Sequence, residues 1–176
     1  MKKIIPFLLA LFMLASCSGA GSNVDTPTEM PMPEIIDQLC EGVKDVPPYE
    51  ATQLTEDDFT YFAGIPYADG LNGYQADALI SSIPHSLVLL HSDNGDTAEL
   101  AQEMLENADP IKWICVAAEV KQTAYTEHYV ILVMSSKEIT EGIMANFENA
   151  VNDGKATMLD EIKADTGAYE NVKVGN

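Results

Sequence analysis

The stretch Tyr129-Val130-Ile131-Leu132-Val133-Met134 decides how this sequence folds. It is a short apolar run with several β-branched residues, which is typical of a buried β-strand. A second apolar run, Ser86-Leu87-Val88-Leu89-Leu90-His91-Ser92, is bounded by polar residues and predicts another buried strand. A third strand is expected over residues 118–124. Because the turn near Tyr125-Thr126-Glu127 is short, the third and first of these strands are predicted to form an antiparallel hairpin.

Helical patterns surround these strands. Apolar residues recur at helical spacing, and capping or breaking residues stand at the ends of each pattern. Pro33 opens the first pattern, Thr55 precedes the second with a capping box, and Pro110 ends the third. The predicted helices cover residues 33–43, 59–63, 97–108 and 137–151.

Weaker patterns complete the expected fold. Residues 75–80 alternate and predict an edge strand, while residues 111–116 fit either a last helical turn or the start of a strand. Residues 158–162 fit a further helical piece, and residues 169–174 fit a terminal strand. Together the patterns predict an α+β domain, a small and mostly antiparallel sheet with helices packed on one face.

The first residues of the chain have the features of an export signal. Lys2 and Lys3 precede an apolar run of about ten residues, and a helix that spans a bilayer needs about twenty. The predicted division of the chain follows from this leader. It has a signal peptide at 1–16, a lipidated cysteine with a flexible linker at 17–32, a globular domain at 33–151 and a C-terminal extension at 152–176.

The leader ends in Leu14-Ala15-Ser16-Cys17, which resembles the lipobox of bacterial lipoproteins. That resemblance implies cleavage before Cys17 and attachment of a diacylglyceryl group to its sulfur. Two acyl chains hold a protein stably on a membrane, whereas one does so only marginally. The alternative is an ordinary secretory leader with a chance cysteine. The linker after Cys17 is rich in small residues, Thr and Pro, and is predicted to hold the domain away from the bilayer.

The charge of the chain restricts its partners. The sequence has 28 acidic against 9 basic residues, a formal net charge of -19. Such a surface repels nucleic acid and anionic lipid headgroups, so we expect no nucleic-acid partner. The acidity is either a solubility surface or a docking face for a cationic partner or for calcium.

Two further cysteines remain once Cys17 is assigned to the lipid. Cys40 lies on the first predicted helix, and Cys115 lies in an apolar segment. Outside the cytoplasm a Cys40–Cys115 disulfide is one interpretation, and two buried free thiols are the other. Neither cysteine belongs to a Cys-x-x-Cys pair, so a redox enzyme is not expected.

No convergent catalytic or metal-binding motif is found in the sequence. His85 and His91 are about 20 Å apart if they share a strand, so they cannot bind one ion. His91 and His128 can meet only at neighbouring strand ends, and all three histidines are expected at the surface or at strand ends. His85 and Ser86 are neighbours on a strand and point to opposite faces, which argues against a catalytic pair. We therefore expect no metal, no cofactor and no enzymatic activity.

One loop-rich region is the candidate place for a ligand. Aromatic residues gather between residues 59 and 74, near three glycines. Core packing is the ordinary role of such residues. A groove formed by Tyr67 and Tyr74 is the alternative, and it is the predicted ligand site.

Three segments carry a family resemblance. They are Ile83-Pro84-His85-Ser86 through Val88-Leu89-Leu90, the segment Pro110-Ile111-Lys112-Trp113-Ile114-Cys115-Val116, and Val130-Ile131-Leu132-Val133-Met134-Ser135. With the lipobox, this pattern resembles a family of bacterial lipoproteins known as a domain of unknown function, over about residues 33–147. The resemblance implies an exported, lipid-anchored protein of a Gram-positive-type envelope, and it implies no catalytic or ligand residues.

The leading functional hypothesis follows from the anchor, the linker and the missing catalytic set. We expect a membrane-anchored lipoprotein on the extracytoplasmic face that binds or scaffolds an envelope protein without catalysis. The alternative is a small-ligand binding lipoprotein that serves a transporter. The body is short for the usual two-lobed binding protein, which places this alternative second.

Overall fold

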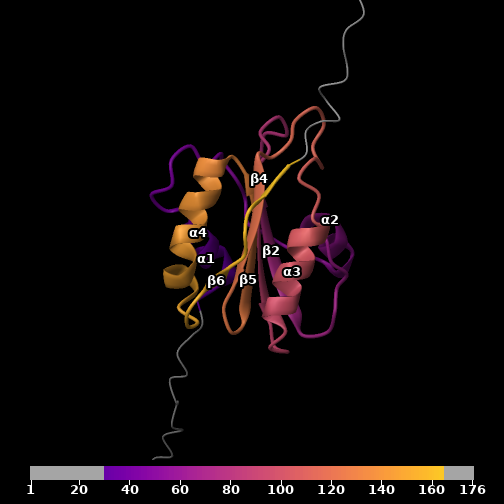
Figure 1. The fold of residues 1–176 in the computed structure, drawn as a ribbon, viewed down its shortest axis with the longest axis vertical. Coiled ribbons are helices and arrows are strands. Elements are labelled where there is room, and N and C mark those ends of the chain that lie inside the picture. Colours follow the sequence, from indigo (N-terminus) through magenta and orange to yellow (C-terminus); the bar gives the residue numbers. More distant parts are fainter. Residues whose placement is uncertain (1–29, 165–176) are drawn as a thin grey trace, which may run out of the picture.

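The fold is seen in a computed structural model that describes residues 30–164 (Figure 1). The signal peptide, Cys17 and the strand predicted at 169–174 lie outside the described residues. Within the described part, no helix has the length and apolar character needed to cross a bilayer.

One antiparallel sheet forms the centre of the molecule. Its strand order is β1-β2-β3-β5-β4-β6, and β7 also pairs with β4. The β4–β5 pair is antiparallel, with Thr123 opposite Leu132, which confirms the predicted hairpin. The α+β class is also confirmed. The strands are β1 Thr52–Gln53, β2 Leu71–Asp77, β3 Ser86–Ser92, β4 Val120–Tyr125, β5 Tyr129–Ser135, β6 Thr157–Met158 and β7 Ile162–Lys163.

The helices cover both faces of the sheet, so the prediction of helices on one face is wrong (Figure 1). On one face lie α1 (Met32–Cys40) and α4 (Lys137–Val151), and on the other lie α2 (Phe59–Ala63) and α3 (Thr97–Asn107). A short 3-10 turn, η1 (Glu56–Asp58), precedes α2. The physical reason lies in β5, which is buried along its whole length.

Each face of β5 belongs to a different hydrophobic core. Ile131 and Val133 pack with α1 and α4, whereas Val130 and Leu132 pack with α2 and α3. Side chains alternate between the two faces of a strand, so a strand that is apolar at every position needs cover on both sides.

Helix ends follow the local sequence closely. Thr55 donates from its backbone N–H and its hydroxyl to the Asp58 carboxylate, at 3.0 and 2.6 Å, as the capping box predicts. The α2 helix ends at Gly64 with a φ of +76°, and a Cβ there would lie 2.5 Å from the backbone N of Ala108. Only glycine fits at this close approach. Lys121 of β4 donates to the carbonyls of Glu106 and Ala108 at the end of α3.

Three weaker predictions need correction. β2 begins at Leu71, not at residue 75, and it is flanked by β1 and β3. The helical piece predicted at 158–162 is wrong, because β6 and β7 pair there with β4. The first part of the expected C-terminal extension therefore contributes to the sheet. The first helix ends at Cys40, and Val43 lies in the following turn.

Candidate functional site

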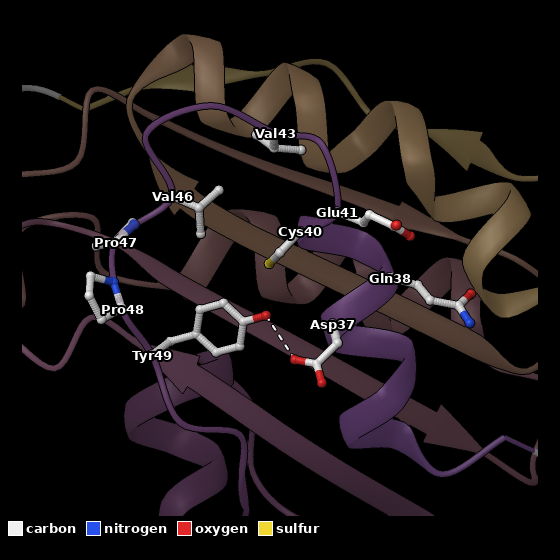
Figure 2. Close-up of a pocket in the computed structure, with 9 residues that line it drawn as sticks. All are labelled: Asp37, Gln38, Cys40, Glu41, Val43, Val46, Pro47, Pro48 and Tyr49. Atoms are coloured by element: carbon white, nitrogen blue, oxygen red, sulfur yellow. Dashed lines mark hydrogen bonds between the residues drawn. The ribbon is translucent and has the colours of Figure 1, made fainter.

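A groove runs between α1 and the loop that follows it (Figure 2). Its volume is about 660 Å³. A carboxylate and an amide from α1 stand on one side with Glu41, which directly follows the helix, and two valines and two prolines from the loop stand on the other. The lining residues are Asp37, Gln38, Cys40, Glu41, Val43, Val46, Pro47, Pro48 and Tyr49.

Tyr49 organises the polar part of this groove. Its hydroxyl donates to Asp37 Oδ1 at 2.9 Å, as the dashed line in Figure 2 shows. Burial, with Cys40 and Asp37 close by, raises the pKa of Tyr49 far above its usual range. Burial also raises the pKa of the Cys40 thiol, and the bond with Tyr49 opposes that rise only in part. A thiol that stays protonated is a poor nucleophile, so this arrangement suits binding better than covalent catalysis.

A second cluster is built around Lys112, where β2 ends and β3 begins. Lys112 Nζ lies 3.1 Å from Asp77 Oδ2 and 3.1 Å from Ser86 Oγ. The Lys112 side chain is only 2% exposed, and burial lowers its pKa while Asp77 opposes that change. Three aromatic rings surround the ammonium group. The centroids of the Tyr61, Phe62 and Trp113 rings lie 5.1, 4.7 and 5.2 Å from Nζ.

His85 extends this buried cluster. Its ring is fully buried, and its Nδ1 lies 3.0 Å from Ser135 Oγ. Its Nε2 has no hydrogen-bond partner among residues 30–164. Burial lowers the pKa of His85 to about 4, with Asp77 opposing and Lys112 adding to the effect. His85 directly precedes β3, so the prediction that it lies at a strand end is confirmed. The prediction that it lies at the surface is wrong, because the ring is buried.

The cluster brings together segments that are distant in sequence, since Lys112 donates to Ser86 and His85 contacts Ser135. A serine hydroxyl beside a lysine is chemically a candidate nucleophile with its base. Ser86 is fully buried in this structure, however. The contacts of Lys112 with Ser86 and Asp77 tie the loop that follows α3 to the start of β3 and the end of β2.

Tyr67 and Tyr74 do not form the predicted groove. Tyr67 packs on the α2–α3 side, where its ring meets that of Phe59 at 5.3 Å. Tyr74 packs on the α1–α4 side. Residues on opposite faces of one sheet do not line one groove, so the predicted ligand site is wrong. The sequence does not predict the groove between α1 and Tyr49, because the loop that lines it has no periodic pattern.

Both described cysteines are free thiols. Cys40 is half-buried in the groove, and Cys115 is exposed in the loop after α3 with a φ of +64°. The Cys40–Cys115 disulfide is therefore not formed, and the expected burial of Cys115 is wrong. Residues 111–116 form neither a helical turn nor a strand.

His91 and His128 meet at the opposite end of the sheet from Lys112. Their rings stack with centroids 5.9 Å apart and planes 11° apart, and His128 Nδ1 lies 2.9 Å from Asp153 Oδ1. Nitrogen lone pairs lie in the ring plane, so two parallel rings do not aim them at one ion. Among residues 30–164, no group of three His, Cys, Asp or Glu is arranged to hold a metal.

Comparison with known proteins concerns the first residues of the chain. Residues 1–18 match the prokaryotic membrane lipoprotein lipid attachment site. The match includes Cys17 and supports a lipid-anchored membrane lipoprotein. No curated protein and no solved structure matches the chain.

Proposed function

We propose that this lipoprotein is held on the extracytoplasmic face of the membrane by Cys17 and binds or scaffolds an envelope protein without catalysis. The observation that carries the proposal is the lipid attachment site at residues 1–18. The buried state of Ser86, His85 and Lys112 supports a non-enzymatic role, because these groups meet where no substrate reaches them. The resemblance to a family of bacterial lipoproteins supports the export and the lipid anchor.

A second function is favoured by one specific observation, the groove of Figure 2. One side of it is apolar, and Asp37 and Glu41 contribute carboxylates to the lining. A small ligand with a cationic group and an apolar body would complement that lining. A small-ligand binding lipoprotein that serves a transporter is therefore the alternative.

The location is tested by two measurements, membrane fractionation and thiol labelling. Cys17→Ala is expected to move the protein from the membrane fraction to the soluble fraction, because Cys17 carries the lipid. A membrane-impermeant maleimide is expected to label the wild-type protein at Cys115 in intact cells, because Cys115 is exposed. Cys115→Ser is the matched control and loses most of the label, since Cys40 is half-buried. Labelling of Cys115 only after lysis, or a Cys17→Ala protein that stays in the membrane, contradicts the proposal.

The choice between the two functions is tested by purification of the full chain in mild detergent from envelope membranes. The scaffolding role predicts that a protein co-purifies in a fixed ratio. Mass spectrometry of the same sample detects any bound small molecule. A small molecule without a protein partner, lost in Val46→Glu, would establish the alternative, because Val46 belongs to the apolar side of the groove.

A further inference from the structure

Four exposed apolar side chains lie around the Lys112 cluster, and we call them the distal apolar surface: Tyr61, Leu79, Ile80 and Ile114. Ile114 is 88% exposed, and each of the other three is more than half exposed. Single exposed apolar residues are normal, but several on segments that meet, here α2 and two loops, are typical of an interaction surface.

Lys112 holds the segments of this surface together. It pairs with Asp77, two residues before Leu79, and its ammonium group lies over the ring of Tyr61. Ile114 follows Lys112 by two residues in the same loop. A buried ion pair with three aromatic contacts restricts the motion of a loop that has no secondary structure. The surface is therefore presented in an ordered form, which lowers the entropic cost of binding.

The surface lies at the end of the sheet that is remote from the linker. Met30 and Pro31, where the linker joins the body, share a shallow pocket with His91 and Tyr129. His91 is the last residue but one of β3, whereas Ser86, bonded to Lys112, begins the strand. A strand of this length places the two ends about 20 Å apart. In Figure 1 the loops that follow β2 and α3 accordingly lie at the top, away from the start of α1.

Charge decides which partner fits. The chain carries a net charge of -19, and the loop after α3 is bounded by the carboxylates of Asp109 and Glu119. The one cation of that loop, Lys112, is buried and paired with Asp77. Two copies of so acidic a chain repel each other, and anionic headgroups repel it too. A surface with an apolar centre and a basic rim complements these features.

We propose that the distal apolar surface docks an envelope protein whose contact surface is apolar at its centre and basic at its rim. This inference rests on the proposed binding function and names its partner class. Ile114 would fill an apolar recess of the partner, and acidic groups at the border would face its lysines and arginines.

The test uses the full chain with its lipobox, produced in its own bacterium. A photoreactive benzophenone amino acid replaces Ile114 in one protein, Glu41 in the groove in a second, and Met158 in a third. Met158 is the matched control, because it is 49% exposed and apolar but pairs with the other end of β4. Irradiated cells are analysed for adducts by mass spectrometry.

The expected result is an adduct from position 114 with one protein whose surface is basic, and none from position 158. Adding Leu79→Ser and Ile80→Ser should reduce that adduct about tenfold, the loss expected when buried apolar contacts are removed. This inference is overturned by any of four results: equal adducts from positions 114 and 158, no adduct from position 114, an adduct with lipid, or an adduct with a second copy of the chain. A protein adduct from position 41 alone overturns it and leaves the proposed binding function standing. No protein adduct from any position overturns both.

Discussion

Replacing Lys112 with methionine should lower the free energy of unfolding by about 3 kcal/mol, because it removes one member of a buried ion pair. Methionine keeps the apolar stem, so the change removes mainly the ammonium group. Asp77 then loses the cation 3.1 Å from its Oδ2, and Ser86 loses a donor at 3.1 Å. Because the Asp77 side chain is 23% exposed, water can solvate part of its unpaired charge. The expected loss of stability is therefore at the lower end of the range for broken buried ion pairs. Urea unfolding at pH 7 measures it.

Two control variants separate the ion pair from a general effect of losing a lysine. Lys137 forms an ion pair with Glu161 at 2.7 Å on the surface. The change Lys137→Met should leave the urea midpoint nearly unchanged, because solvent screens exposed pairs. Combining Asp77→Asn with Lys112→Met should restore much of the stability, because no unpaired charge remains. If Lys112→Met and Lys137→Met behave alike, the cluster does not stabilise the loop after α3.

The most regular parts of the fold could be predicted from sequence. β3, β5 and the β4–β5 hairpin were found because apolar runs separated by a short turn have few other solutions. The cover on both faces was missed, although the signal was present. Val130, Leu132 and Met134 alternate with Ile131 and Val133, so both faces of β5 are apolar. Such a run predicts burial on both sides.

The weakest strands and the polar cluster depend on contacts distant in sequence. β6 and β7 have two residues each, and Met158 with Ile162 also fits helical spacing. Their strand state comes from pairing with the exposed edge of β4, which no local pattern reports. The bond of Lys112 to Asp77 joins residues 35 positions apart. Sequence identified the segment that contains Lys112, but only the fold places its ammonium group against Asp77.

His85 should make the protein less stable in mild acid, by about 3 kcal/mol between pH 6.5 and pH 4. Burial lowers its pKa from 6.5 to about 4 in the native state; Asp77 opposes that change and Lys112 adds to it. In the unfolded chain the ring titrates near 6.5. Above pH 6.5 both states are neutral and the full stability is present. As the pH falls toward 4, only the unfolded state gains the proton, so stability is lost; below 4 the loss levels off.

Many carboxylates also titrate in this range, so the test compares pH profiles. Urea unfolding of the wild type and of His85→Gln is measured at pH 7, 5.5 and 4. Glutamine does not titrate and still reaches the Ser135 hydroxyl, so the difference between the two profiles isolates the imidazole. The wild type should lose about 3 kcal/mol more than His85→Gln over this range, and His85→Leu should follow His85→Gln. Parallel profiles, or an NMR titration that places the pKa of His85 near 6.5, would show that the ring is protonated without cost and that its burial is not maintained.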